Sequence, residues 1–397
     1  MSSTVFLEKL LDGADVEWRP ILEVFHLKNG YTPSKSKQEF WEDGTVPWFR
    51  MDDIRQNGRI LSDSLQKVSE SGVKGGKLFP ANSIIVATTA TIGEHALIRV
   101  PFLANQQFTV LNLRDEYIRK LDIKFLFYFC FLLSRWCKQN TKKSSFPSVN
   151  MNGFRKFKFP IPFPDNPEKS LAIQGEIVRI LDTFMELTTE LTTELTARKK
   201  QYEYYREKLL TFDDADVEWR PLGEVAEFCR GTAITKMQST DGDIPVVANG
   251  PVPTYFHGEH NREGETVVVA RSGAYAGYVS YWNRPIFLTD AFSIHPQSKV
   301  IQSRFVYYLL QNKQGQIHAM KKGAGVPHVR VKEVQKYDVP IPSLAEQQRI
   351  VSILDKFDAL TTSLTEGLPR EIELRQKQYE YYRDLLLNFP KPEKDSA

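Results

Sequence analysis

Two adjacent lysines occur at corresponding places in the two halves of the chain. Lys142 and Lys143 precede the sequence Phe-Pro-Ser-Val, and Lys321 and Lys322 precede Val-Pro-His-Val. Paired lysines beside small residues suit contacts with the phosphates of a nucleic acid. A single lysine pair is usually only a solvated surface, but its recurrence at matching positions favours DNA binding.

Reading a base in a DNA groove requires forked or paired hydrogen-bonding groups, which Arg, Asn and Gln supply. Arg271 in the second half corresponds to Thr88 in the first half. Two different half-sites read on one scaffold would require such a difference, although ordinary surface drift would also give it. The predicted DNA-binding residues are Lys35, Arg50, Lys74, Lys77, Asn105, Gln106, Lys142, Lys143, Arg230, Lys236, Arg271, Lys321, Lys322, His328 and Arg330.

The sequence lacks the motifs of a self-contained enzyme. It contains no [DNS]PP[YFW] methyltransferase motif, no GxxxxGK[ST] phosphate loop and no GxSxG nucleophile turn. His257 and His260 stand apart from other metal ligands, so zinc is not expected there. Cys130, Cys137 and Cys229 form no paired pattern and are predicted to be reduced thiols. We therefore predict that the chain has no catalytic site and binds no metal or cofactor.

The elements that position these residues are duplicated along the chain. Many segments recur in the same order, which shows an internal repeat. The clearest pairs are ADVEWRP at 14–20 and 215–221, IVRILDTF at 177–184 with IVSILDKF at 350–357, and RKKQYEYYREKLLTF at 198–212 with RQKQYEYYRDLLLNF at 375–389.

Each half is predicted to be an α+β domain followed by a long helix. Short alternating or apolar runs, bounded by Gly, Asn and Pro, predict strands at 83–87, 108–113, 266–270 and 287–294. The apolar run 123–137 is too short to cross a bilayer and predicts a buried core helix. The predicted boundaries are a domain at 1–165, a helical spacer at 166–212, a domain at 213–345, a C-terminal helical region at 346–390 and a disordered tail at 391–397. The two long helices themselves are predicted at 168–212 and 344–389, so the second begins two residues before its region.

Apolar residues recur at steps of three and four along both helices, which predicts a coiled-coil seam. The tetrapeptide repeat ELTTELTTELT at 186–196 breaks the heptad, and Pro369 is expected to kink or break the second helix. Antiparallel pairing of the two helices would create a pseudo-two-fold axis, as in a reader of two half-sites. Alternatively, the helices dimerise with another protein. The predicted seam or partner-contact residues are Ile177, Ile180, Phe184, Leu187, Leu191, Leu195, Tyr202, Tyr205, Leu209, Ile350, Ile353, Phe357, Leu360 and Leu364.

Bulk composition fits this organisation. A chain of 397 residues, 41% hydrophobic and 25% charged, suffices for two or three folded domains. The net charge of +3 excludes a histone-like binder but allows local basic patches. The N-terminus lacks a basic start followed by an apolar core, so we expect no signal peptide and a cytoplasmic protein.

The duplicated arrangement resembles the specificity subunit of type I restriction–modification systems. The residues that carry the resemblance are ADVEWRP at the start of each half, FPIP at 159–162, VPIPSLAEQQRIVSILDKFDALT at 339–361 and RQKQYEYYRDLLL at 375–387. The tetrapeptide repeat is similar to that of the type IC subfamily. The resemblance implies two target recognition domains separated by two long antiparallel helices, and no catalysis by this chain.

The resemblance also implies the partners. They would be double-stranded DNA with a bipartite, asymmetric site, two methyltransferase subunits and two restriction subunits, without a membrane. S-adenosylmethionine, ATP and Mg²⁺ would be bound by the partner subunits and not by this chain. The alternative hypothesis is a coiled-coil scaffold or adaptor that binds other proteins and reads no DNA.

Overall fold

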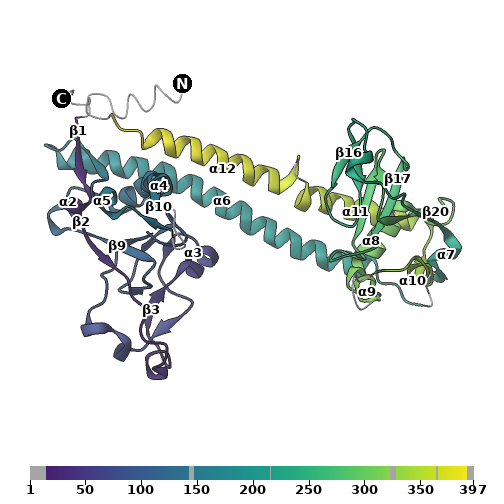
Figure 1. The fold of residues 1–397 in the computed structure, drawn as a ribbon, viewed down its shortest axis with the longest axis horizontal. Helices are drawn as coiled ribbons and strands as arrows, with labels where there is room; N and C mark the ends of the chain where they lie inside the picture. Colours follow the sequence, from purple (N-terminus) through teal and green to yellow (C-terminus); the bar gives the residue numbers. More distant parts are fainter. Residues whose placement is uncertain (1–14, 143–146, 215, 322–327, 364, 391–397) are drawn as a thin grey trace. The chain divides into compact units, whose positions relative to one another are not determined.

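The chain forms two compact units in a computed structural model that describes residues 15–142, 147–214, 216–321, 328–363 and 365–390 (Figure 1). Unit 1 comprises Met1–Thr188 with Arg375–Ala397, and unit 2 comprises Thr189–Leu374. Lys143, Lys322, Leu364 and the predicted tail 391–397 lie outside the described residues.

Unit 1 contains a five-stranded sheet beside a three-stranded sheet. The five-stranded sheet has the order β2 (Phe25–Asn29), β9 (Phe108–Leu113), β6 (Ser83–Ala87), β7 (His95–Ile98) and β4 (Ile60–Leu61). The three-stranded sheet has the order β5 (Lys67–Val68), β3 (Val46–Phe49) and β8 (Leu103–Ala104). Strands β6 and β9 have the predicted bounds. Separate two-stranded ladders join β1 (Val16–Pro20) to β12 (Lys158–Pro162) and β10 (Thr141–Lys142) to β11 (Ser148–Val149). The shorter helices are α2 (Ile21–Val24), α3 (Met51–Asn57) and α5 (Met151–Phe154), with 3-10 turns η1 (Gln38–Phe40), η2 (Glu70–Gly72), η3 (Lys74–Gly76) and η4 (Asp115–Tyr117).

Helix α4 (Ile123–Gln139) is the predicted core helix and lies on strands β6 and β7. Its N-cap is Asp122, whose carboxylate accepts hydrogen bonds from the Lys124 and Phe125 backbone N–H groups at 2.6 and 3.1 Å. Most of its apolar side chains are buried in the unit 1 core. No helix within the described ranges is long and apolar enough to span a bilayer.

Unit 2 repeats this architecture. Its four-stranded sheet is ordered β14 (Ala226–Arg230), β20 (Ala291–Pro296), β17 (Glu265–Ala270) and β18 (Val279–Asn283), and its three-stranded sheet is ordered β16 (Tyr255–His257), β15 (Ile244–Val247) and β19 (Phe287–Leu288). Helix α8 (Ser303–Asn312) lies on β17 and β18, as α4 does on β6 and β7. The other elements are the β13 (Glu218–Pro221) and β21 (Asp338–Ile341) pair, helices α7 (Leu222–Val225), α9 (Gln314–Ala319) and α10 (Val331–Gln335), and η5 (Lys236–Gln238).

The prediction of one strand at 287–294 was wrong. The chain leaves β19 after Leu288 and enters β20 at Ala291, so it passes from one sheet to the other. The Thr289 backbone N–H still donates to the Val247 carbonyl of β15 at 2.9 Å, so the chain leaves the three-stranded sheet only after Thr289. A continuous apolar run cannot reveal such a change of sheet.

Helix α6 (Pro167–Leu209) passes without interruption from unit 1 into unit 2. The second predicted long helix is instead two helices, α11 (Leu344–Thr362) and α12 (Gly367–Leu386). Gly367 has φ +79°, and a Cβ there would lie 2.4 Å from the Ala359 carbonyl oxygen. Pro369 lies in the first turn of α12, where its missing N–H costs no helical hydrogen bond. The break therefore falls just before Pro369, as predicted, and the positive φ of Gly367 is a second obstacle to a continuous helix.

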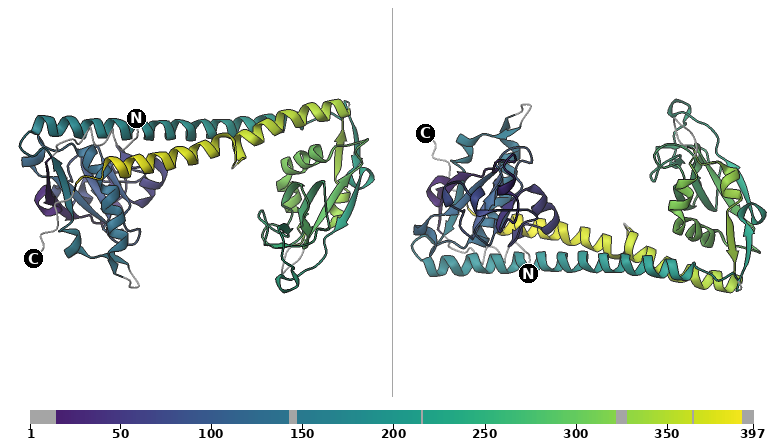
Figure 2. Two further views of the ribbon diagram at one scale, coloured as in Figure 1. Left: turned by 90° about the horizontal axis from the view of Figure 1, so that it is seen from above. Right: turned by 90° about the horizontal axis from the view of Figure 1, so that it is seen from below.

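The predicted antiparallel packing of the long helices is found inside each unit (Figure 2). In unit 1, α4 contacts α6 in parallel order, through the pairs Asp122–Gln174 and Tyr128–Met185. It contacts α12 and the residues after it in reverse order, through Phe125–Phe389 and Phe131–Tyr379. In unit 2, α8 contacts α11 in parallel order, through Gln302–Gln347 and Tyr308–Asp355. It contacts the end of α6 and the residues after it in reverse order, through Gln311–Tyr202 and Phe305–Phe212. The α+β fold with its internal repeat is thus confirmed.

Candidate nucleic-acid interface

The ends of several strands meet in unit 1 at a surface that we call edge 1, comprising residues 49–50, 88–90, 104–107 and 147–149. The Asn105 N–H donates to the Phe49 carbonyl at 3.0 Å, and the Thr88 N–H donates to the Gln107 carbonyl at 2.9 Å. The Thr88 carbonyl accepts from the Val149 N–H at 2.9 Å. These hydrogen bonds bring the segment after the predicted lysine pair to the end of strand β6.

Unit 2 forms the corresponding edge 2 from residues 247–249, 271–273, 288–290 and 328–329. The Arg271 N–H donates to the Asp290 carbonyl at 3.3 Å, and its carbonyl accepts from the Val329 N–H at 2.9 Å. Arg271 thus occupies the place that Thr88 occupies in unit 1. The two edges share their backbone connections and differ in side chains.

Edge 1 brings together the predicted residues Arg50, Asn105 and Gln106. The Asn105 side chain is turned inward, because its Oδ1 accepts from the Gln107 N–H at 3.1 Å. Gln106 is exposed and its Oε1 accepts a hydrogen bond from the Thr32 hydroxyl. Gln106 therefore projects further toward solvent than Asn105 does.

Arg50 and Lys35 line one shallow depression of about 480 Å³ together with Trp41 and Trp48. The Arg50 guanidinium lies 5.4 Å from the Trp48 ring centroid, and the two tryptophan rings meet edge to face at 4.9 Å. Cations beside aromatic faces form a surface that suits a nucleic acid. The two tryptophans were not among the predicted residues. Val46-Pro-Trp48 corresponds to Ile244-Pro-Val246 in the internal repeat, but such a match does not reveal the depression.

Lys74 and Lys77 lie on a separate exposed loop. Tyr31 connects this loop to the segment that carries Lys35. Its hydroxyl donates to the Gly72 carbonyl at 3.4 Å and accepts from the Lys74 N–H at 2.7 Å. Lys142 is exposed on β10.

In unit 2, the half-buried Lys321 makes two contacts within its own domain. Its ammonium group lies 2.6 Å from His318 Nε2 and donates to the Ala274 carbonyl at 3.3 Å. His328 is half-buried on edge 2, where it forms a β-bridge with Ser272. The remaining predicted residues, which are exposed and lie at or beyond strand and helix ends, are Arg230, Lys236 and Arg330.

A small polar network behind Arg271 was also missed by sequence reasoning as a set. The Ser272 hydroxyl donates to the Asp290 carboxylate, and the Asn249 amide donates to Ser272 Oγ at 3.3 Å. These three residues come from three different strand ends of edge 2. No local signal in the sequence brings them together.

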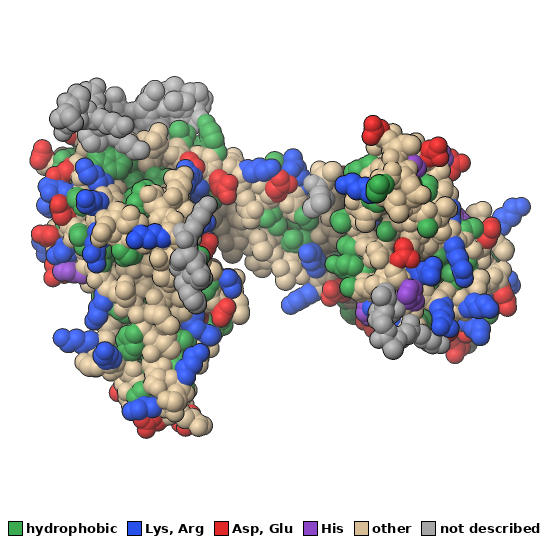
Figure 3. Space-filling view, in the orientation of Figure 1, with side chains coloured by type: hydrophobic (Ala, Val, Ile, Leu, Met, Phe, Trp, Pro, Cys, Tyr) green, Lys and Arg blue, Asp and Glu red, His purple; other side chains and the backbone are tan. Residues whose placement is uncertain are grey.

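The charges at the surface are mixed. On the faces shown in Figure 3, Lys and Arg side chains of both units are interspersed with Asp and Glu. The fully buried His95 makes no contribution, because burial, reinforced by Arg59, lowers the pKa of His95 to about 3. Among the described residues, no group of three or more His, Cys, Asp and Glu is placed to hold a metal ion. The exposed Lys and Arg side chains are therefore the groups that suit contacts with phosphates.

The predicted seam residues fall into three classes of exposure. Ile177, Ile350 and Tyr202 are buried. Leu187 and Tyr205 are 39% and 37% exposed. The half-buried members are Ile180, Phe184, Leu191, Leu195, Leu209, Ile353, Phe357 and Leu360.

The model of the type I restriction modification DNA specificity domain matches residues 14–199 and 215–374. The chain belongs to this family. Its two matched segments correspond to the two halves of the internal repeat. The chain is therefore a DNA-specificity subunit of a type I restriction–modification system.

Relatives in this family cover nearly the whole chain. The type I restriction enzyme EcoprrI specificity subunit of Escherichia coli is 48% identical over 377 residues, which cover 92% of this chain and 93% of the relative. The EcoR124I/EcoR124II specificity subunit of Escherichia coli is 34% identical, with 99% of each chain covered. The crystal structure of the S subunit of a type I system from M. genitalium has the same fold, with a TM-score of 0.59 at 21% identity and coverage of 96% and 98%. A structure described for complex assembly and conformational transition of the type I system gives a TM-score of 0.63 at 17% identity, covering 94% of this chain and 97% of that chain.

Proposed function

We propose that this specificity subunit reads the two halves of a bipartite, asymmetric DNA sequence, one half with edge 1 and the other with edge 2. The observation that carries the proposal is the pair of matching edges with different side chains. Thr88 is buried and lies 3.0 Å from the Thr109 hydroxyl, whereas Arg271 at the corresponding place is exposed. One scaffold with two different surfaces is what an asymmetric site requires.

Arg271 is the best-placed base reader on edge 2. Both its backbone groups are held by hydrogen bonds to other segments, so the root of the side chain is fixed. Its guanidinium has no hydrogen bond or ion pair with any described residue. A fixed arginine with a free fork suits bidentate binding to guanine O6 and N7 in the major groove.

The helices are proposed to carry the partner subunits. Tyr204 and Tyr381, in the duplicated YEYY segments, are 59% and 57% exposed, and large exposed aromatic side chains are typical of interfaces. We propose two methyltransferase subunits and two restriction subunits as partners, in the cytoplasm. S-adenosylmethionine, ATP and Mg²⁺ are bound by those subunits, and this chain is not catalytic.

The uninterrupted part of α6 is proposed to act as a ruler between the half-sites. Its tetrapeptide repeat at 186–196 lies entirely within the helix. Each four residues add about 6 Å and a net rotation of about 40°. One base pair adds about 3.4 Å and about 35°. Twist therefore favours one base pair per tetrapeptide, and rise favours nearly two.

Co-expression with the methyltransferase subunit in a methylation-free host tests the proposal. Methylated adenines are then mapped across the genome. The expected result is a single bipartite motif with a fixed spacer. A well-formed complex that neither methylates nor retards DNA would instead show a scaffold that binds only proteins.

A further inference from the structure

Each domain is attached to a long helix by a buried glutamine. Gln174 of α6 is fully buried, and its Oε1 accepts from the Asp122 backbone N–H at 2.8 Å. Its Nε2 donates to the Lys120 carbonyl at 2.9 Å. One amide group therefore binds both a donor and an acceptor of the turn that leads into α4.

The second half repeats these contacts atom for atom. Gln347 of α11 is fully buried, and its Oε1 accepts from the Gln302 N–H at 2.9 Å. Its Nε2 donates to the Val300 carbonyl at 3.0 Å. The same geometry is thus kept in two domains whose sequences differ strongly.

An aspartate two turns further along each helix makes the second attachment. Asp182 accepts from the Tyr128 hydroxyl at 2.6 Å and from the Lys124 ammonium at 2.5 Å. We call these contacts, together with those of Gln174, the first latch.

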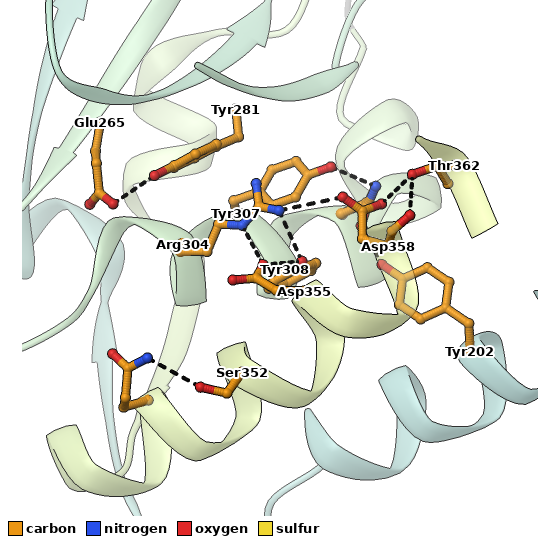
Figure 4. A network of polar contacts seen from close by, with 12 residues as sticks. Tyr202, Glu265, Tyr281, Arg304, Tyr307, Tyr308, Ser352, Asp355, Asp358 and Thr362 are labelled. Carbon is orange, nitrogen blue, oxygen red and sulfur yellow. Dashed lines mark hydrogen bonds and ion pairs between the residues drawn. The ribbon is translucent and has the colours of Figure 1, made fainter. Parts of the chain in front are cut away.

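Asp355 makes the equivalent contacts in unit 2. It accepts from the Tyr308 hydroxyl at 2.5 Å and from Arg304 Nε at 2.7 Å (Figure 4). These contacts and those of Gln347 form the second latch.

The second latch has one more carboxylate than the first. Arg304 Nη2 also lies 3.4 Å from Asp358 Oδ2, and the guanidinium lies 4.5 Å from the Tyr281 ring centroid (Figure 4). Met185 occupies the position of Asp358 in the first half of the repeat. The two latches therefore share the glutamine, tyrosine and aspartate contacts and differ in the cation and in the carboxylate of Asp358.

The chemistry of the latches suits positioning more than stability. Apolar side chains around them, such as Ile177 and Ile350, already bury the contact between domain and helix. Partly buried ion pairs add little net stability, because desolvation offsets much of their attraction. Hydrogen bonds, in contrast, depend strongly on direction and distance. Two such attachments on one helix face fix the angle at which a domain stands on its helix.

We propose that the two latches are positioning elements that make the spacer between the DNA half-sites stringent. The proposal rests on the function proposed above. A domain that rocks on its helix presents its edge at more than one place, so half-sites at neighbouring separations become acceptable. The sequence of each half-site does not change, because neither latch belongs to an edge.

The test uses the full chain with its methyltransferase partner. Asp355→Asn and the isosteric Tyr308→Phe are assayed on DNA with the native half-sites and a spacer that is native, one base pair shorter or one longer. Removing a hydrogen bond to a charged group corresponds to about a tenfold change in an equilibrium. The variants are expected to reduce the preference for the native spacer by about that factor, with unchanged half-site sequences.

Two controls separate positioning from stability. Asp214→Asn removes an exposed carboxylate in the same unit and is expected to keep the wild-type spacer preference. Val269→Ala removes buried volume from strand β17 and is expected to lower the thermal stability while keeping the preference.

A double variant tests the equivalence of the latches. Lys124→Arg combined with Met185→Asp converts the first latch into the second and is expected to keep the native spacer preference. Asp355→Asn and Tyr308→Phe variants that fold and still prefer the native spacer as strongly as wild type would overturn the latch proposal. A wild-type complex that methylates no bipartite site would overturn the proposed function instead.

Discussion

Phe184 of α6 stacks on Tyr382 of α12 in unit 1, with ring centroids 5.2 Å apart and planes at 18°. The repeat places Phe357 and Tyr205 in the same relationship in unit 2, at 5.7 Å and 24°. Each unit therefore contains this aromatic pair between antiparallel helices, and in unit 2 Phe357 also stacks on Tyr202 at 6.0 Å. The pair combines residues from different halves of the sequence.

Replacing Tyr382 by Ala is expected to lower the free energy of unfolding by about 2 kcal/mol, because the half-buried ring loses apolar contact and stacking. Tyr381→Ala is the matched control, because the Tyr381 ring lies next to Tyr382 in the chain but is 57% exposed. Chemical denaturation of both variants measures the difference. Equal losses from the two substitutions would contradict a specific role for the stacked pair.

Two glycines allow each edge to be disturbed separately. A Cβ on Gly30 would lie 2.2 Å from the Asn105 carbonyl oxygen. A Cβ on Gly231 would lie 1.9 Å from the Thr289 carbonyl oxygen. Gly30→Ala is expected to weaken recognition of one half-site and Gly231→Ala of the other, because the displaced backbone moves a different edge.

Competition binding against single-base variants of each half-site measures both effects. Gly250→Ala is the control, because a Cβ at Gly250 meets nothing within 4 Å. Loss of the same half-site in both variants would argue against one edge per half-site.

Arg271→Lys is expected to relax the requirement for one guanine by about 1–3 kcal/mol, since lysine keeps the charge but loses the fork. Binding to duplexes with 7-deazaguanine, which lacks the N7 acceptor, should weaken wild type and leave Arg271→Lys nearly unchanged. A uniform loss of affinity across all sequences would show that Arg271 contacts phosphate instead.

Deleting Thr188–Leu191 removes one tetrapeptide from α6. We expect the recognised spacer to shorten by one or two base pairs while both half-sites stay the same. Methylome mapping of the variant measures the spacer directly. An unchanged spacer would refute the ruler.

The second half offers a matched control for this deletion. Arg198 follows Phe184 by 14 residues, whereas Arg375 follows Phe357 by 18, so the second half is four residues longer there. Helix α11 ends at Thr362 and helix α12 begins at Gly367. Removing the four intervening residues, 363–366, is expected to leave the spacer unchanged, because the continuous helix α6 keeps its length.

His95 makes the stability of the chain depend on pH. Burial lowers the pKa of His95 to about 3, below the value near 6.5 expected in the unfolded chain. Between these values the unfolded chain binds the proton and the folded chain does not. The stability is therefore fully present above about pH 6.5 and falls by up to about 1.4 kcal/mol for each pH unit below it.

Denaturation of wild type and His95→Leu between pH 7 and pH 5 measures this slope. The variant is expected to lose much of it, because the position can no longer bind a proton. His26→Gln, at an exposed position on β2, is expected to keep it. A wild-type slope in His95→Leu would assign the pH dependence to other groups.

Features set by local pattern could be predicted from the sequence. The internal repeat, the apolar helix α4, the strands β6 and β9 and the uninterrupted α6 all follow from residue type and periodicity over short stretches. The exchange of Thr88 for Arg271 was visible in the same way, because it needs only an alignment of the two halves. These signals are local, so they survive without knowledge of the tertiary fold.

Only the tertiary structure decided which side chains meet. Lys321 is predicted to contact phosphate, and only the structure places its ammonium beside His318 and the Ala274 carbonyl. The break before α12 was expected from Pro369, but the close approach of Gly367 to Ala359 could be seen only in the structure. Such contacts join residues from separate loops, strands and helices, and their geometry is fixed by packing. The sequence therefore determined the duplicated scaffold, whereas the fold determined the two edges and the latches that hold them.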